Sequence, residues 1–211
     1  MIFLAFVLLL ATPACWVYSQ RLAVVPFAGA VGIWLLQSFN GVAGGPGGPP
    51  ARGAVAAYEA SAPSPAPSVQ FRDASGRSVR LADFRGRVVL LNLWATWWGP
   101  CVQELPSLDR LQAQLGGADF QVVALSVDRR GVAAVRPYFA KLKIANLPIY
   151  VEPQNQLATT LGLQVLPSTI IIGPHGLMLG RMIGAAQWDA PESIALVRHY
   201  IEAARSPPPS S

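Results

Sequence analysis

The spacing of apolar and polar residues predicts alternating strands and helices in the C-terminal part of the chain. Residues 69–81 (VQFRDASGRSVRL) predict two short strands around a turn. Residues 87–95 (RVVLLNLWA) and 120–128 (FQVVALSVD) are nearly continuous apolar runs, which are typical of strands that are covered on both faces. Between these runs, leucines recur every three or four residues over 101–115 and predict a helix, which a Gly-Gly pair ends.

The later part of the chain continues this alternation. It predicts a helix, a short strand, a short helix, a two-stranded hairpin and a final amphipathic helix, at residues 132–143, 147–152, 155–162, 168–184 and 190–205 respectively. Pro137 is expected near the first turn of the first of these helices or at a kink. Two β-α-β units followed by an antiparallel edge predict an α/β fold, in which a mixed β-sheet carries helices on both faces.

An apolar leader precedes the predicted domain. Residues 2–18 and 22–39 each approach the roughly 20 residues that a membrane-spanning helix needs. Arg21 is the only charged residue before Arg52. We expect residues 1–39 to be a membrane anchor of one or two helices, with Arg21 on the cytoplasmic side. A cleaved signal peptide is the alternative, although no basic region precedes the first apolar stretch.

Two segments have the composition of disordered chain. Residues 40–68 consist mostly of Gly, Pro, Ala and Ser, so they cannot bury enough apolar surface to offset the entropy lost on ordering. They are expected to form a linker, and residues 206–211 (SPPPSS) a disordered tail. The folded domain is therefore expected over residues 69–205, on the extracytoplasmic side of a membrane such as the bacterial periplasm.

Composition and charge argue against several classes of function. The chain of 211 residues carries a net charge of +5, but its basic residues are scattered and form no cluster interleaved with aromatic residues, so we expect no nucleic-acid partner. The two cysteines are Cys15 in the leader and Cys101, which excludes a disulfide within the domain. His175 and His199 have no second ligand nearby in sequence, so neither a metal nor a cofactor is expected.

The segment around Cys101 is similar to a known redox site. The sequence GRVVLLNLWATWWGPCVQELPSL at 86–108 resembles the active-site segment of the thioredoxin superfamily, especially the membrane-tethered, extracytoplasmic thiol–disulfide oxidoreductases of the TlpA and ResA type. The pattern F-x-D-x-x-G-x-x-V-x-L at 71–81, DFRG at 83–86 and VLPSTIII at 165–172 extend the resemblance. It implies a thioredoxin-like fold and a protein partner that carries a thiol or disulfide.

In that family a W-C-x-x-C motif begins a helix, and its first cysteine attacks a substrate disulfide that the second then resolves. The resemblance places the attacking cysteine at Trp98 and the resolving cysteine at Cys101. It implies that the neighbouring residues contact the substrate, namely Trp97, Gly99 and Pro100. Because an indole side chain has no thiol chemistry, this chain acting alone cannot carry out the two-cysteine cycle. One base separates a cysteine codon from the tryptophan codon, so resequencing the locus tests whether Trp98 is encoded.

Two opposed effects act on the pKa of the remaining thiol. The N-terminus of a helix favours a thiolate at Cys101, whereas burial raises the pKa of the thiol. The cysteine is alternatively a small buried apolar residue without chemistry. Glu104 follows three residues later on the same helix face and is a candidate for proton handling, or simply an acidic residue in the first turn. Asn92 stands where some thioredoxins carry a buried aspartate.

Pro167 matches the cis-proline that faces the active site in this superfamily. Its neighbour Leu166 would then offer backbone groups to an extended peptide. The alternative is an ordinary proline at the entry of a strand.

Three functions remain open on the sequence. The first is an oxidoreductase-family protein impaired in two-cysteine cycling, which acts through Cys101 and a partner thiol. The second is a non-catalytic binding module for extended peptides or a redox partner. The third is a one-cysteine peroxidase, because C-V-Q-E at 101–104 is similar to the region around the peroxidatic cysteine of peroxiredoxins. Those enzymes carry threonine where this chain has Trp98.

Overall fold

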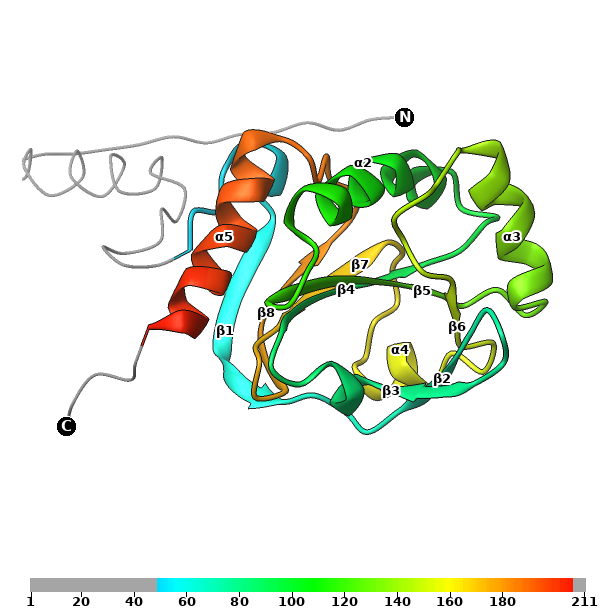
Figure 1. The fold of residues 1–211 in the computed structure, drawn as a ribbon, viewed down its shortest axis with the longest axis horizontal. Helices are drawn as coiled ribbons and strands as arrows, with labels where there is room; N and C mark the ends of the chain where they lie inside the picture. The colour runs from blue at the N-terminus through cyan, green and yellow to red at the C-terminus, as the bar shows by residue number, and fades with distance from the viewer. Residues whose placement is uncertain (1–48, 207–211) are drawn as a thin grey trace, which may run out of the picture. The chain divides into compact units, whose positions relative to one another are not determined.

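The computed structural model describes residues 49–206, which form an eight-stranded sheet with helices on both faces (Figure 1). The strands follow the order β1-β8-β7-β4-β5-β6-β2-β3. Their bounds are β1 Tyr58–Pro65, β2 Gln70–Asp73, β3 Ser78–Arg80, β4 Val88–Trp94, β5 Phe120–Ser126, β6 Tyr150–Val151, β7 Ser168–Ile172 and β8 Leu177–Ile183. The helices are α2 Gly99–Leu115, α3 Val132–Lys141, α4 Gln156–Thr160 and α5 Pro191–Arg205, with 3₁₀ turns η1 Gly53–Val55 and η2 Leu81–Phe84.

The sheet is mixed, as the sequence predicts. β4 pairs in parallel with β5 and antiparallel with β7, while β5 pairs in parallel with β6. The β2–β3, β7–β8, β1–β8 and β2–β6 pairs are antiparallel. Every residue of β4 is buried, because this central strand is flanked by strands on both edges and covered on both faces. The α/β fold with a mixed sheet and helices on both faces is thereby confirmed.

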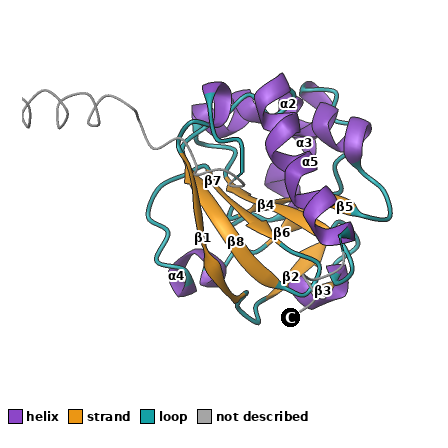
Figure 2. Ribbon diagram, turned by 90° about the vertical axis from the view of Figure 1, so that its left-hand side faces the viewer, coloured by secondary structure: helices purple, strands orange, loops and turns teal. Residues whose placement is uncertain are grey.

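Two apolar cores lie on the opposite faces of the sheet. Leu90 and its even-numbered neighbours on β4 face α2, α3 and α5, whereas Leu91 and the odd-numbered residues face α4, η2 and the β2–β3 hairpin. Figures 1 and 2 show α2, α3 and α5 on one side of the sheet and α4 on the other. This arrangement follows from the period of two along a strand, which sends alternate side chains to opposite faces.

The ordered domain begins earlier than the sequence indicates. Residues 40–68 are expected to be a linker, but η1 and β1 occupy much of this range and β1 extends the sheet along β8. Tyr58 is the reason, because its ring packs over Gly180 of β8, where a Cβ atom would lie 2.1 Å from the Tyr58 hydroxyl. That hydroxyl donates a hydrogen bond of 2.7 Å to the Tyr200 hydroxyl of α5. The mainly exposed remainder of β1 needs no large apolar residue, since its backbone pairs with β8.

Further predictions from the sequence concern Pro137 and the two ends of the chain. Pro137 lies inside α3. α5 ends at Arg205, where the folded domain is expected to end, and residues 207–211 of the expected tail lie outside the described residues. The expected membrane anchor at residues 1–39 also lies outside them. Within residues 49–206, none of the helices has both the length and the apolar character needed to cross a bilayer.

Candidate functional site

The candidate site lies where β4 ends and α2 begins. Trp98 is the residue that precedes α2, and its carbonyl accepts hydrogen bonds from the backbone N–H groups of Cys101 and Val102, at 3.1 and 3.2 Å. Pro100 stands in the first turn, where its missing N–H removes no helical hydrogen bond. The structure therefore places Cys101 in the first turn of a helix, with an indole three residues before it.

The thiol of Cys101 is buried in the core beneath this turn. Cys101 is 1% exposed and packs within the cluster that α2 forms with the sheet. Burial raises the pKa of its thiol from 9.0 to about 11, and the nearby carboxyl groups of Glu104 and Asp128 add to the increase, while backbone hydrogen bonds oppose it. Burial thus prevails over the helix N-terminus, and the group is a neutral thiol at physiological pH.

Glu104 occupies a buried polar pocket on the same helix. Its Oε1 accepts hydrogen bonds from Asn92 Nδ2, at 3.2 Å, and from the indole N–H of Trp188. Its Oε2 is buried without a hydrogen-bond partner. Burial raises the pKa of this carboxyl from 4.5 to about 8, although the hydrogen bond from Trp188 opposes the increase. Near neutral pH the group is therefore largely a protonated acid.

Trp188 is a member of this network that the sequence does not reveal. It lies 84 residues from Glu104 along the chain and is fully buried. Asn92 completes the network from β4, since it sits opposite Thr169 of β7 and donates a 3.0 Å hydrogen bond to the hydroxyl of that residue. No local motif marks such a long-range contact.

The outer surface of the site is apolar. Trp97 and Trp98 are 67% and 44% exposed, with ring centroids 6.4 Å apart in an edge-to-face arrangement. Together with Leu166 and Val165 they line a depression of about 380 Å³, which we call the tryptophan groove. Its remaining lining residues are Val127, Asn155, Ala158, Leu163 and Gln164.

The other predicted site residues lie around this groove. The Leu166–Pro167 peptide bond is cis, as the resemblance implies, and Pro167 itself is buried. Gly99 and Pro100 are exposed in the first turn of α2 but do not line the groove. The fold thus brings Trp97, Trp98 and Leu166 together from two segments that are far apart in the sequence.

Asp128 holds the segment that carries the tryptophans. Its carboxylate accepts hydrogen bonds from the backbone N–H of Thr96 at 2.9 Å, from the Thr96 hydroxyl at 2.6 Å and from the Ser126 hydroxyl at 2.8 Å. Because Asp128 follows the end of β5 and Thr96 follows the end of β4, these contacts tie together the carboxyl ends of two parallel strands. Binding sites in α/β sheets commonly lie at this edge.

Taken together, these features support binding better than thiol chemistry. Nucleophilic attack on a disulfide or a peroxide requires an accessible thiolate. Cys101 is buried and neutral, and position 98 carries an indole. The tryptophan groove, by contrast, is open to the solvent and presents two aromatic rings that a partner side chain can cover.

Comparisons with known proteins agree with this fold. The model of the AhpC/TSA family matches residues 63–179, more than half of the chain. The thiol-disulfide oxidoreductase ResA of Bacillus thuringiensis subsp. konkukian is 28% identical over 119 residues, which are 56% of this chain and 68% of that protein. ResA of Geobacillus thermodenitrificans is 32% identical over 113 residues, 54% of this chain and 64% of that protein.

Comparisons with solved structures also agree with this fold. A Chlorobium tepidum structure described as the thiol:disulfide interchange protein DsbE superimposes with a TM-score of 0.58 at 27% identity, covering 69% of this chain and 99% of that one. StoA of Bacillus subtilis is 15% identical and superimposes with a TM-score of 0.52, over 61% of this chain and 96% of StoA. At this identity the likeness shows the fold alone. The chain therefore belongs to the AhpC/TSA family and is similar to thioredoxin-like thiol–disulfide oxidoreductases.

Proposed function

We propose that this chain is a thioredoxin-fold binding module for extended protein segments and that it does not turn over disulfides by a two-cysteine cycle. The observation that carries the proposal is the pairing of an exposed apolar surface with an unreactive thiol. Trp98 stands in the place of the attacking cysteine and lines the groove, while Cys101 lies 1% exposed with a raised pKa.

The groove suits an extended segment because of where it lies. One wall is formed by Trp97 and Trp98 before α2, and the other by Val165 and Leu166 before β7. An apolar side chain inserted between these walls would remove aromatic surface from water at about 25 cal/mol per Å². Backbone groups of Leu166 remain available to pair with the backbone of the bound segment, as in other extended-peptide sites.

The redox alternatives share one requirement. A one-thiol oxidoreductase that captures a partner and a one-cysteine peroxidase both need a thiolate that reaches the surface. The burial and the raised pKa of Cys101 argue against both. Glu104 has no attacking thiol to serve at position 98, so we assign it a structural role in the buried network around Trp188.

We also propose that the domain is tethered on the extracytoplasmic side of a membrane through residues 1–39. The apolar stretches of the leader and the lone Arg21 support this proposal. The linker would then be shorter than residues 40–68, because the ordered elements begin at Gly53.

Peptide binding by matched variants tests the proposed function. Val165→Asp places a charge in the groove and should weaken the binding of a labelled extended peptide. Ile183→Asp is the matched control, since Ile183 is a similarly exposed apolar residue (40% against 51%) outside the groove. Cys101→Ser should bind as the natural chain does.

The same protein should not accelerate the reduction of insulin by dithiothreitol. Loss of peptide binding in Cys101→Ser, or insulin turnover at the rate of an ordinary thioredoxin, would overturn the binding function and restore a redox role.

A further inference from the structure

A second depression adjoins the tryptophan groove and differs from it in character. It has a volume of about 630 Å³ and shares Trp97, Val127 and Asn155 with the groove. Its other lining residues are mostly polar or charged, namely Thr96, Asp128, Arg129, Arg130, Ala134, Pro153 and Gln154. A segment bound in the groove would extend past Trp97 into this basic depression.

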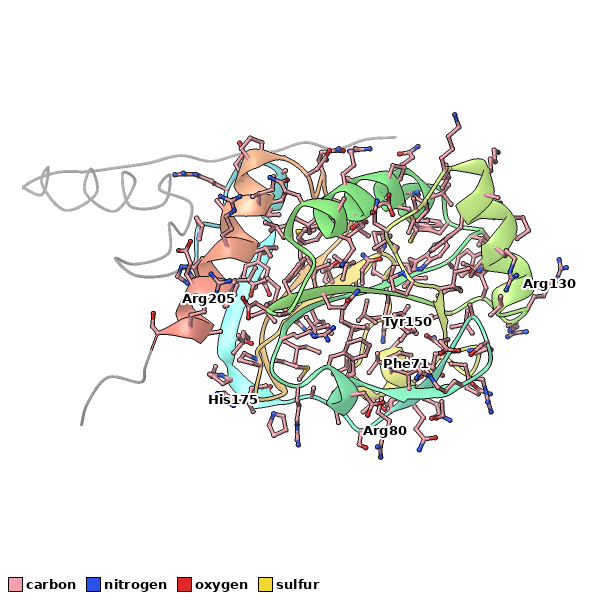
Figure 3. All side chains as sticks on the ribbon, in the orientation of Figure 1. Phe71, Arg80, Arg130, Tyr150, His175 and Arg205 are labelled. Carbon is pink, nitrogen blue, oxygen red and sulfur yellow. The ribbon has the colours of Figure 1, made fainter. Side chains whose placement is uncertain are left out.

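The charge that faces this depression is positive. Arg129 and Arg130 are exposed, and neither takes part in an ion pair within the described part of the chain. Figure 3 shows the side chain of Arg130 directed outward beside α3. Two guanidinium groups are therefore free to meet a ligand at the edge of the groove.

Among the described residues, the neighbouring carboxylates form no ion pair with these arginines. Asp128 is 4% exposed, and both of its oxygens accept hydrogen bonds from Thr96 or Ser126. Glu152 is 1% exposed, accepts a hydrogen bond from the backbone N–H of Leu157 and lines neither depression. Of the described residues that line the two depressions, Asp128 is the only acidic one.

We infer that the module selects extended protein segments in which a bulky apolar residue is followed or preceded, within a few positions, by an aspartate or a glutamate. The apolar side chain occupies the tryptophan groove and the carboxylate meets Arg129 and Arg130. Guanidinium groups suit this role because they remain charged and pair with carboxylates through two parallel hydrogen bonds. The inference rests on the proposed function and names the chemistry of its partner.

Matched peptides test this selectivity with the full chain in a non-ionic detergent. Capped, fluorescein-labelled peptides of eight residues carry one Phe, with Asp placed one to four positions to either side, and each has a twin in which Asn replaces Asp. Fluorescence anisotropy gives the Kd of each twin. In at least one register we expect the Asp peptide to bind about fivefold more tightly, as fits an exposed ion pair. This preference should fall as salt rises to about 0.5 M.

Charge variants assign the preference to its arginines. In Arg129→Gln/Arg130→Gln the two twins should bind equally, and the Asn peptide should bind as it does to the natural chain. Arg85→Gln/Arg198→Gln removes the same charge from two exposed arginines outside both depressions and should keep the preference.

The outcomes distinguish peptide binding in the groove from selectivity for acidic residues. If no peptide of either set binds the natural chain, the proposed function itself fails. If the twins bind with equal Kd in every register, or if the control variant also loses the preference, the groove is a binding site but the acidic selectivity is wrong.

Discussion

At the scale of single residues, the buried Glu104 makes stability depend on pH. Its pKa is raised to about 8 in the folded chain, against an ordinary value of 4.5. Between these values the folded state holds a proton that the unfolded state releases, so the free energy of unfolding falls as the pH rises through this window. Glu104→Gln keeps a hydrogen-bond acceptor for Trp188 and removes the ionisable group. Between pH 5 and pH 8, the free energy of unfolding of this variant should rise relative to that of the natural chain by on the order of 2–4 kcal/mol.

Urea denaturation of residues 49–211, followed by tryptophan fluorescence at several pH values, measures this difference. Glu202→Gln, which changes an exposed glutamate of α5, is the control and should run parallel to the natural chain. Parallel curves for Glu104→Gln and the natural chain would mean that Glu104 is ionised in the fold.

The reactivity of Cys101 is the second prediction at this scale. A pKa raised from 9.0 to about 11 reduces the thiolate fraction at pH 7 about 100-fold, and burial adds a barrier to the reagent. Alkylation of the native chain by iodoacetamide, followed by mass spectrometry, should therefore be at least ~100-fold slower than in urea. In Trp98→Ala, which removes the indole beside the first turn, Cys101 should be alkylated faster than in the natural chain. Rapid native labelling at pH 7 would show that the thiol is accessible.

At the scale of elements, β1 depends on the absence of a side chain at Gly180. A Cβ atom there would lie 2.5 Å from Tyr58 Cζ and 2.6 Å from the Glu59 carbonyl oxygen, so strand and ring would both have to move. Gly180→Ala should lower the free energy of unfolding by roughly 2 kcal/mol or more, because overpacking displaces β1 from β8. Gly117→Ala, whose Cβ would meet nothing within 4 Å, is the matched control and should stay close to the natural stability.

Thermal unfolding by circular dichroism compares the two alanine variants, and hydrogen exchange on β1 locates the effect. If both variants lose the same stability, the fit of Tyr58 over Gly180 does not hold β1 in place.

At the scale of the whole molecule, the orientation of the proposed anchor decides where the groove can meet a partner. Alkaline phosphatase is active only outside the bacterial cytoplasm, so its fusion after residue 48, before η1, should be active in cells. The matched green fluorescent protein fusion, exported in unfolded form, should be dark. Bright fluorescence with inactive phosphatase would place the domain in the cytoplasm and overturn the proposed tether.

The sequence by itself was sufficient for the order of the strands and α-helices from β2 onward, because each of them has its own local period of apolar residues. The apolar run at 88–94 and the leucine spacing of 101–115 correspond to β4 and α2. The tryptophan at position 98, three residues before Cys101, is likewise a fact of the sequence, and the resemblance to W-C-x-x-C proteins implies from it that two-cysteine chemistry is lost.

Tertiary structure decided what depends on distant partners. Composition alone made residues 58–65 resemble a linker, yet Gly180 and Tyr200 provide the surface that orders them as β1. The opposed influences on Cys101 were settled by burial, which is a property of the packed core and not of any motif. The tryptophan groove and the adjacent depression with Arg129 and Arg130 combine loops after β4, β5 and β6 with the segment before β7. The pattern of apolar residues within one segment does not indicate which loops the sheet brings together.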